Sequence, residues 1–403
     1  MKIAFFTNTI LEHGGGLEKY FIDVSSELAK RYPDDEISVI TFNERRTEAL
    51  QRVLSLYYAK EMPISNIYRE KTEDILRKLG RARYIKCASF RELKKELSRH
   101  DVVYSKNEII DLSILKWFGY GSLPPVIVGA HTPVRILHPI SGHDRLHNFL
   151  YMGFLYKFLL EGTKAAHVLN ADDQRLFRER LFSKSKSIHK ILLPFHVSEK
   201  EIGRLSSHDE LNVLFVGRLT ALKGLDVLFS CIRILGRTDE FGSIKFRIAG
   251  SGESDLTRDA RALSEEYSNV EYQGHVPHDE MDSLYRWSDI VIIPSRHETA
   301  NYVVLEATEF ARVVVASDIP GPREAIRNGK TGFLLPVDAK SFAETILFLL
   351  KTKKERPKDL IDMGNAAREY VRGKFDPDNV YGQFRSMLED SGRVTGVFGP
   401  NKK

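Results

Sequence analysis

The chain has little of what marks several classes of protein. Only two cysteines, Cys87 and Cys231, occur among its 403 residues, and they lie far apart without the spacing of metal ligands. Reduced structural thiols are therefore expected, rather than a disulfide framework or a zinc site. No apolar run approaches the length of a membrane span. The apolar residues that follow Met1 are too few for a signal peptide, so the sequence predicts a cytoplasmic protein.

What the chain does contain is typical of a soluble globular protein. Hydrophobic residues make up 42% of it and charged residues 29%. A length of 403 residues exceeds what one ordinary core serves, so two domains are expected. The formal net charge of +5 suits anionic ligands or an acidic membrane surface, and a solvated basic face explains it equally well.

The most informative stretch runs from Ser288 to Phe333. Residues 289–293 form a short, β-branched apolar run, as in a buried parallel strand. Residues 302–310 repeat apolar residues at helical spacing, and 313–316 predict a second strand. The residues 318–322, Asp-Ile-Pro-Gly-Pro, predict a turn. Strand, helix and strand make a βαβ crossover, and sheets of this kind bind ligands at the carboxyl ends of their strands.

Two carboxylates stand out in this stretch. Seven residues separate Glu298, in the loop after the first strand, from Glu306, just over one turn into the helix. A site that holds a diphosphate at a helix N-terminus and offers separate carboxylates to hydroxyl groups suits a nucleotide-sugar. The alternative is that both are solvated surface acids.

The preceding residues repeat the strand-and-loop pattern. Residues 211–216 predict a strand, and the following loop carries Arg218 and Lys223. A guanidinium binds phosphate bidentately and an ammonium supplies a point charge, so both suit a diphosphate. Two further strands, 245–249 and 270–273, end in loops that carry Gly250 and the pair His275 and Val276.

The first half of the chain gives weaker signals. Strands are expected at 2–6, 37–42, 102–105, 125–129 and 165–170, and a helix at 17–31. Three glycines, Gly14 to Gly16, precede that helix, where backbone N–H groups approach a phosphate or simply form a turn. They do not form the GxGxxG motif, which disfavours a dinucleotide-binding fold. His131 follows the strand 125–129, where an imidazole is well placed for a ligand or has only a structural role.

Two further segments bear on partners and domains. Residues 147–161 are strongly apolar and aromatic, and they predict a helix that either lies in a membrane interface or packs on the sheet. Residues 198–210 are polar and charged, and they are the best candidate for an interdomain linker.

Together, these motifs resemble the signature of the retaining glycosyltransferases of family four, which have the GT-B fold. The resemblance covers most of the chain, is strongest over residues 211–336 and is weaker over 43–120. The matching residues of the stretch 288–333 and its margin are Pro294-Ser295, Glu298, Glu306-Ala307, Ala316-Ser317-Asp318, Gly321-Pro322, Glu324 and Gly332-Phe333-Leu334. The segments Gly217-Arg218-Leu219 with Lys223-Gly224, and Gly15-Gly16-Leu17-Glu18, match two further motifs of the family.

The resemblance implies an α/β architecture of two Rossmann-like, doubly wound domains facing across a cleft. Residues 1–195 would form the acceptor-binding domain, and 196–375 the donor-binding domain. The last helix, about 376–390, would pack back on the first domain, and 391–403 would form a tail.

The resemblance also implies a function for particular residues. The expected activity is transfer of a sugar from a nucleoside-diphosphate sugar to a hydroxyl acceptor, which is a glycan, a lipid-linked saccharide or a glycolipid. No metal ion and no cofactor beyond the donor substrate are expected, and no nucleic acid. A position at the inner membrane face is a further candidate. The implied catalytic residues are Glu298, His131, Lys223 and Arg218, and the implied donor-binding residues are Gly15, Gly16, Arg218, Lys223, Gly250, His275, Val276, Glu298, Asn301 and Glu306.

The chain departs from the family pattern at several positions. After Glu298 the family favours Gly-Phe-Gly, and this chain has Thr299-Ala300-Asn301, where the Asn301 side chain stands in for a backbone amide. Ala311 and Val313 replace a usual Gly and Pro, an exchange interpreted as packing, and Phe195-His196 replaces Asn-Gly. Two alternatives therefore stay open, a nucleotide-sugar-binding module altered in catalysis and a nucleotide-sugar epimerase of the same fold. The sequence does not name the sugar, the nucleotide, the acceptor, the linkage or the oligomeric state.

Overall fold

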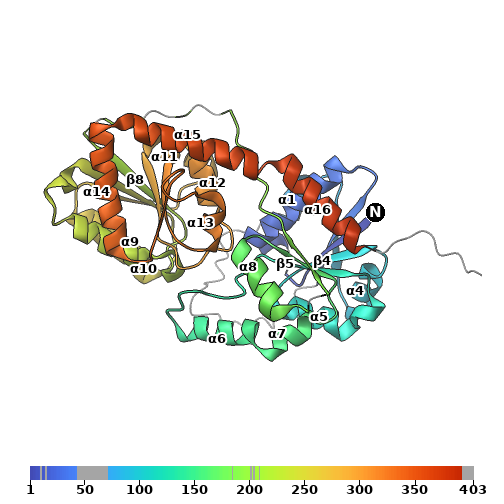
Figure 1. Ribbon diagram of the computed structural model, residues 1–403. Coiled ribbons are helices and arrows are strands. Elements are labelled where there is room, and N and C mark those ends of the chain that lie inside the picture. Colours follow the sequence, from blue (N-terminus) through green and yellow to red (C-terminus); the bar gives the residue numbers. More distant parts are fainter. Residues whose placement is uncertain are drawn as a thin grey trace, which may run out of the picture. The chain divides into compact units, whose positions relative to one another are not determined.

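The structure is a computed structural model that describes residues 1–9, 11–13, 16–42, 71–183, 185–199, 202, 205–207 and 209–392. It divides into two compact units, each with its own parallel sheet (Figure 1). The first unit comprises Met1–Arg135, Ser141–Ile191 and Tyr381–Lys403. The second comprises Ile136–Ile140 and Leu192–Val380.

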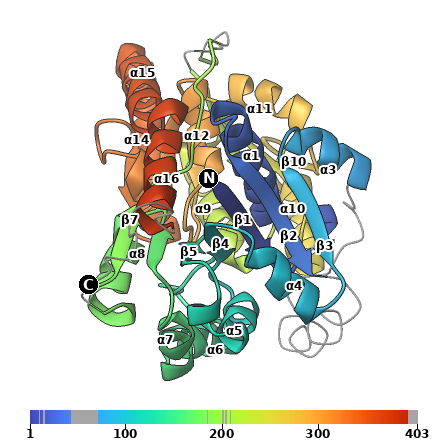
Figure 2. The same ribbon diagram turned by 90° about the vertical axis from the view of Figure 1, so that its right-hand side faces the viewer.

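In the part of the first unit that the structure describes, seven parallel strands form one sheet in the order β3-β2-β1-β4-β5-β6-β7. Figure 2 shows β1, β2 and β3 side by side. The strands are β1 (Lys2–Thr7), β2 (Glu36–Phe42), β3 (Arg83–Cys87), β4 (Val102–Lys106), β5 (Val126–Ala130), β6 (Ala165–Val168) and β7 (Ser187–Lys190).

The helices of this unit cover the sheet with apolar faces. In α1, Phe21, Val24 and Leu28 recur at helical spacing and are buried. The described helices are α1 (Gly16–Arg31), α3 (Thr72–Leu79), α4 (Phe90–Leu97), α5 (Ile109–Phe118), α6 (Gly142–Met152), α7 (Phe154–Leu160) and α8 (Ala171–Leu176).

The last helix, α16 (Pro377–Ser391), is part of the first unit from Tyr381 onward. The ring of Phe384 stacks on Phe5 of β1 at 6.2 Å between centroids. Arg385 forms an ion pair of 2.8 Å with Asp35, which is almost fully buried. The helix α16 is thus built into the same core as the first strand.

The second unit repeats this architecture. Among its described residues, six parallel strands run in the order β10-β9-β8-β11-β12-β13. Every residue of β11 and β12 is buried, as expected for β-branched runs in a sheet covered on both faces. The strands are β8 (Leu211–Val216), β9 (Ile244–Ala249), β10 (Val270–Gly274), β11 (Ile290–Ile293), β12 (Val313–Ser317) and β13 (Phe333–Leu335).

Helices cover this second sheet as well. They are α9 (Leu225–Leu235), α10 (Ser254–Glu266), α11 (Met281–Trp287), α12 (Tyr302–Glu309), α13 (Pro320–Ala325), α14 (Ala339–Glu355) and α15 (Pro357–Lys374). In both sheets the strand order reverses once, between β1 and β4 and between β8 and β11. Such a reversal opens a crevice at the carboxyl ends of the two strands, where ligands of doubly wound folds bind.

The structure corrects two predictions of local structure. The single helix expected over residues 147–161 is two helices, α6 and α7, separated at Gly153, whose backbone is extended. The turn expected over 318–322 is largely the start of α13, which has proline at its first position, where the missing N–H group leaves no hydrogen bond unmade.

The chain passes from the first unit to the second at Ile191–Leu192. The described residues of the polar stretch 198–210 belong to the second unit and are fastened to it. The backbone N–H of Ser198 donates to Glu309, and that of Ser206 donates to Asp289 at 2.7 Å. These residues are therefore a packed margin of the second unit.

Candidate active site

The clearest cluster of predicted site residues lies where the second sheet reverses its strand order. Strands β8 and β11 are neighbours there, and the loops at their carboxyl ends carry Lys223 and Glu298. The Nζ atom of Lys223 lies 2.5 Å from Oε1 of Glu298. The hydroxyl of Ser295 donates to the same oxygen at 2.8 Å. Glu298 is only 8% exposed, so its charge is held by a cation and a hydroxyl away from most of the solvent.

Glycine fixes the contact between these two loops. Gly224 has φ +71°, and a Cβ atom there would lie 1.9 Å from the carbonyl oxygen of Pro294. Only glycine allows both this conformation and this approach. Arg296 adds two hydrogen bonds of 2.6 Å to Asp226, at the start of α9. The loop after β8 and the loop after β11 are therefore one rigid piece.

Glu306 is placed by a second, separate arrangement. It lies in α12, half-buried, and its Oε2 atom accepts a 2.6 Å hydrogen bond from the hydroxyl of Tyr285 in α11. Burial and the neighbouring Glu306 carboxylate raise the pKa of Tyr285 well above its usual value, so the phenol keeps its proton and donates. This is the only hydrogen bond of the Glu306 side chain among the described residues, which leaves Oε1 available.

Asn301 has a structural role in the same helix. It is the N-cap of α12, and its side-chain oxygen accepts a hydrogen bond from the backbone N–H of Val304. Its side chain is almost fully buried, so only the amide nitrogen remains to meet a ligand.

The remaining predicted donor residues lie on the adjoining strand ends. A Cβ atom on Gly250 would lie 1.8 Å from the carbonyl oxygen of Gly217, so the loops after β8 and β9 are also in close backbone contact. The N–H of Gly250 donates to Gly274 at 2.6 Å, which extends this contact to β10. Beyond it, His275 is exposed and Val276 is partly buried, and Arg218 is exposed beside Gly217.

His131 lies in the first unit, just after β5 and partly exposed. Its Nε2 atom is 2.6 Å from the hydroxyl of Tyr104, which belongs to β4. Desolvation and the neighbouring His167 hold the pKa of His131 well below its usual value, so the ring is neutral. Of the two predicted glycines, Gly16 begins α1 and Gly15 lies outside the described residues.

Sequence reasoning missed Tyr285, Ser295, Tyr104 and His167. Ser295 is part of the recognised Pro-Ser strand end, so its motif pointed to it. The other three lie inside a helix or strand and look like ordinary core residues. Only the contacts of their hydroxyl or ring nitrogen atoms distinguish them.

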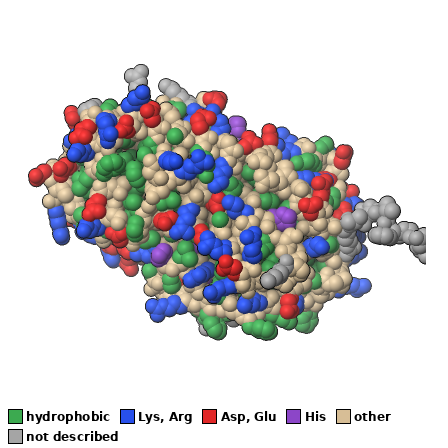
Figure 3. Space-filling model, in the orientation of Figure 1, with side chains coloured by type: hydrophobic (Ala, Val, Ile, Leu, Met, Phe, Trp, Pro, Cys, Tyr) green, Lys and Arg blue, Asp and Glu red, His purple; other side chains and the backbone are tan. Residues whose placement is uncertain are grey.

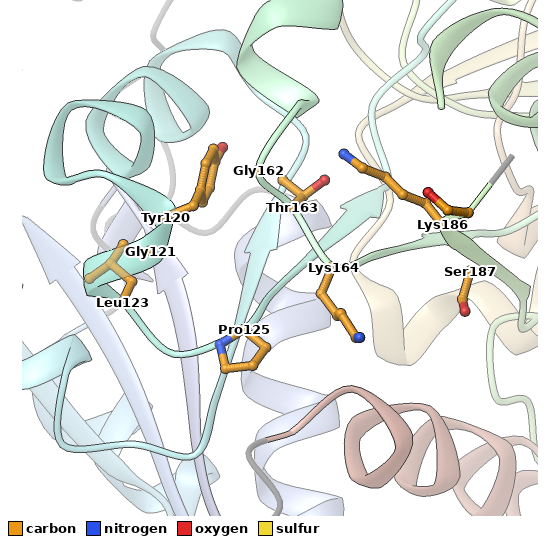
Figure 4. A pocket seen from close by; sticks show the side chains of 10 residues that line it. Tyr120, Gly121, Leu123, Pro125, Gly162, Thr163, Lys164, Lys186 and Ser187 are labelled. Carbon is orange, nitrogen blue, oxygen red and sulfur yellow. The ribbon is translucent and has the colours of Figure 1, made fainter. Parts of the chain in front are cut away.

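A pocket of about 470 Å³ lies elsewhere, and it does not contain these residues. Figure 4 shows its lining, with Tyr120, Leu123 and Pro125 across from Lys164 and Lys186. These residues precede β5, β6 and β7, so the pocket is at the amino ends of the strands. It is on the opposite edge of the sheet from His131.

The described residues show no metal-binding cluster and no membrane-spanning helix. Within these ranges, no three His, Cys, Asp or Glu side chains gather closely enough to bind a metal ion. Among the helices of the described part, none combines the length and apolar character needed to cross a bilayer.

Comparison with known sequences finds a family that part of the second unit resembles. Residues 198–369 match the family described as glycosyl transferases group 1. Over 181 residues the chain is 32% identical to D-inositol 3-phosphate glycosyltransferase of Corynebacterium efficiens, which covers 43% of this chain and 41% of that protein. The chain thus aligns with less than half the length of this curated relative.

Comparison with solved structures covers nearly the whole chain. Sucrose-phosphate synthase from Thermosynechococcus elongatus matches 96% of this chain and 98% of its own, with a TM-score of 0.70 and 17% identity. Anabaena Alr3699/HepE in complex with UDP-glucose matches 97% of this chain and 100% of its own, with a TM-score of 0.67 and 16% identity. These matches confirm the predicted fold, an α/β GT-B architecture of two Rossmann-like domains.

Proposed function

We propose that the chain transfers a sugar from a nucleoside-diphosphate sugar to an acceptor hydroxyl, because residues 198–369 of its second unit match the glycosyl transferases of group 1. The acceptor is a glycan, a lipid-linked saccharide or a glycolipid. The observation that carries the proposal is the 2.5 Å pair of Lys223 and Glu298. It sets a cation for a diphosphate beside a carboxylate for hydroxyl groups at the point where the strand order reverses.

Each residue has a role in this proposal. Arg218 and Lys223 bind the diphosphate and neutralise the charge that grows on it as it leaves, which is the main electrostatic contribution expected in the transition state. Glu298 accepts hydrogen bonds from hydroxyl groups of the transferred sugar. Glu306, with its free Oε1 atom, accepts from the ribose hydroxyls of the nucleotide. On donor binding, Lys223 exchanges a carboxylate partner for a diphosphate oxygen.

The transfer proceeds with retention of configuration. The acceptor oxygen bonds to the anomeric carbon on the face from which the diphosphate oxygen departs. The acceptor hydroxyl loses its proton to that departing oxygen, so the products are the glycoside and the nucleoside diphosphate. We propose that no metal ion takes part, because Arg218 and Lys223 supply the positive charge. Transfer in EDTA at the rate measured with Mg²⁺ supports this part, and loss of transfer in EDTA contradicts it.

A thermal-shift screen against UDP, GDP, ADP and their common sugar conjugates tests the donor. A ligand at one hundred times its dissociation constant adds about 2.7 kcal/mol of stability, which raises the melting temperature measurably. Stabilisation by one nucleotide and its sugar, lost in Lys223→Ala, supports the proposal. No change in melting temperature with any ligand of the panel contradicts it.

The same screen, followed by product analysis, separates the alternatives. Donor binding without transfer to any acceptor in a glycan and lipid panel indicates a binding module in which residues 299–301 have altered the sugar site. Epimerisation of the donor sugar without an acceptor indicates a nucleotide-sugar epimerase.

A second proposal concerns a membrane. The helices α5, α6 and α7 expose an apolar face made of Trp117, Phe149, Phe154, Leu155 and Phe158. Trp117 is 84% exposed and Phe154 is 83% exposed, which is unusual for large apolar side chains. Figure 3 shows hydrophobic side chains along the lower edge of the molecule, over α6 and α7.

Basic residues border this apolar face. Arg145, Lys157 and Lys164 are exposed, and the Nζ atom of Lys116 lies 4.1 Å from the ring centroid of Phe158. Glu161 lies among them, and its Oε2 atom is 3.6 Å from the Nζ atom of Lys116. Aromatic side chains with a cationic margin match a bilayer whose lipid head groups are anionic. We therefore propose that the first unit docks on an anionic membrane, at its cytoplasmic face.

Sedimentation with liposomes tests the docking. The protein is expected to sediment with vesicles that contain phosphatidylglycerol and to stay in solution with pure phosphatidylcholine. The triple variant Trp117→Ser, Phe149→Ser and Phe154→Ser is expected to stay in solution with both. Phe348→Ser, an exposed phenylalanine of the second unit, is the matched control and leaves sedimentation unchanged. No sedimentation of the unaltered protein with anionic vesicles contradicts the proposal.

A further inference from the structure

A line of hydrogen bonds crosses the first sheet beneath His131. The Nε2 atom of His131 lies 2.6 Å from the hydroxyl oxygen of Tyr104. The same oxygen lies 2.6 Å from Nδ1 of His167. The Nε2 atom of His167 lies 2.8 Å from the carbonyl oxygen of Ile191. These residues lie in or just after four neighbouring strands, β4, β5, β6 and β7.

The carbonyl at the far end sets the direction of every bond in this line. A carbonyl oxygen only accepts, so Nε2 of His167 carries a hydrogen. The Nδ1 atom of a neutral His167 is then an acceptor, and the hydroxyl of Tyr104 donates its one hydrogen to it. The oxygen of Tyr104 therefore accepts from His131, which places the hydrogen of that ring on Nε2.

Burial keeps all three groups in the neutral forms that this order requires. Tyr104 and His167 are fully buried. Desolvation raises the pKa of Tyr104 well above its usual value, so the phenol keeps its hydrogen. Desolvation also lowers the pKa of His167 to about 4, and the pKa of His131 is well below its ordinary value. At neutral pH no group in the line is charged.

Several residues pack closely against the line, among them Tyr20, whose ring centroid lies 4.1 Å from that of His131. Gly129 of β5 lies beside the first bond, and a Cβ atom there would lie 2.1 Å from the hydroxyl oxygen of Tyr104 and 2.7 Å from Nε2 of His131. Phe384 of α16 covers the other side, with its ring centroid 5.2 Å from that of Tyr104 and 5.4 Å from that of His167. The strand glycine and the last helix thus enclose the line.

We propose that Tyr104 and His167 are positioning residues that hold His131 as the tautomer protonated at Nε2, so that His131 meets its ligand as a hydrogen-bond acceptor through Nδ1. Among the residues that the structure describes, no hydrogen bond engages Nδ1 of His131. Its ligand is therefore a hydrogen-bond donor, which in a sugar is a hydroxyl group, and not an ionised phosphate oxygen, which only accepts. The identity of that hydroxyl as one of the transferred sugar rests on the proposed function; the tautomer does not.

Histidine ring ¹⁵N NMR tests the tautomer without any substrate. The spectrum distinguishes protonated from unprotonated ring nitrogen atoms, and a His131→Gln variant assigns the signals. In the unaltered protein His131 is expected to be protonated at Nε2. The variant His167→Leu removes the ring nitrogen that accepts the hydrogen bond of the Tyr104 hydroxyl. That hydroxyl is then expected to donate to Nε2 of His131, and the hydrogen of the His131 ring to move to Nδ1.

Two variants complete this test. In His167→Gln the amide oxygen accepts from Tyr104 and the amide nitrogen donates to Ile191, so the original tautomer of His131 is expected to remain. His100→Leu is the matched control, because His100 is also buried and bonded to a backbone carbonyl but lies outside the line. Protonation of His131 at Nδ1 in the unaltered protein, or one tautomer in all four proteins, overturns the proposal.

Kinetics with the donor found by the screen give the functional reading. Loss of one acceptor for a sugar hydroxyl is expected to raise KM for the donor about tenfold in His167→Leu and less than about twofold in His167→Gln. A shifted tautomer with unchanged KM contradicts the assignment of the hydroxyl to the donor sugar. If no donor binds at all, the proposed function fails, and the NMR result still decides the tautomer.

Discussion

The two units have the same strand order, yet they hold their predicted site residues by different means. In the second unit, loops next to each other are joined through backbone atoms, with Gly224 against Pro294 and Gly250 against Gly217. In the first unit, His131 is held by side chains from strands far apart in sequence. Backbone contacts leave glycines at fixed places in a motif, whereas side-chain contacts in a core leave no local pattern. The second unit is therefore the one whose predicted site residues form recognisable sequence motifs.

The largest effect is expected from Lys223→Ala. It removes the cation at the strand reversal, and turnover is expected to fall by about two to three orders of magnitude, as for other groups that stabilise transition-state charge. Steady-state transfer with the donor found by the screen measures it. Lys245→Ala, which removes an ion-paired and more exposed lysine of the same unit, is the control. Near-normal turnover in Lys223→Ala would remove Lys223 from its proposed role.

Two glycines with the same backbone conformation test the role of the loop contact. Gly224 and Gly329 have φ values of +71° and +72°, but only Gly224 faces another backbone atom. Gly329→Ala is expected to lower the free energy of unfolding by about 1 kcal/mol through conformation alone. Gly224→Ala is expected to lower it by about 3 kcal/mol, because Pro294 must also move. Urea unfolding measures both, and equal losses would show that the contact contributes nothing.

The first unit is expected to be sensitive to acid through His167. The pKa of His167 is about 4 in the folded protein, against an ordinary value of 6.5. Between these two pH values the unfolded chain therefore binds a proton at His167 and the folded chain does not. Its contribution to stability is therefore complete above pH 6.5 and is lost as the pH falls toward 4, by about 3 kcal/mol.

The measurement compares the unaltered protein with His167→Gln by urea unfolding at pH 7.5 and pH 4.5. Burial raises the pKa of Asp111 to about 7 and that of Asp173 to about 6, which acts in the opposite direction. Both proteins contain these acids, so their effect cancels in the difference. An equal loss of stability in the two proteins would exclude His167 as the cause.

A smaller effect is expected from Tyr285→Phe. The variant removes the hydrogen bond that orients Glu306 and keeps the ring that stacks on Phe310 at 5.6 Å. KM for the donor is expected to rise about tenfold with little change in kcat, because nucleotide binding is lost and the reacting atoms are not touched. Tyr267→Phe is the control, since this tyrosine packs on Phe241 in another part of the unit. A fall in kcat at constant KM would contradict the assignment of Glu306 to the ribose.

The smallest effect concerns Ala311, which has φ +52°. From the sequence, the exchange of the family glycine for alanine was interpreted as a matter of packing. The structure shows instead that this position has a left-handed backbone conformation, which favours glycine. Ala311→Gly is expected to stabilise the protein by about 0.5–1 kcal/mol, because a left-handed residue with a Cβ atom is strained. Ala366 is exposed and lies in the middle of α15, and Ala366→Gly is expected to lower the stability of the protein, because glycine is a poor helix former. The melting temperatures of the two variants measure this contrast.

The fold class and most strands of both sheets could be predicted from the amino-acid sequence. The apolar runs of β8, β11 and β12 are short and bounded by loops, so each was placed to within a residue or two. The sequence did not place β3, β7 or β13, whose side chains are mostly exposed or half-buried and carry little periodicity. It also failed at Gly153, because a single glycine in an apolar run does not by itself end a helix.

The way in which the site residues are held depends on contacts between distant parts of the chain, which the sequence does not show. The motifs named Lys223, Glu298 and Glu306, but not the ion pair of the first two or the phenol that orients the third. No sequence motif pointed to Tyr104 or His167. Each lies inside a strand, and its role depends on a hydrogen-bond partner more than twenty residues away in the sequence. Local sequence reports the conformation of a loop, and the direction of a hydrogen bond depends on what the fold brings to its far end.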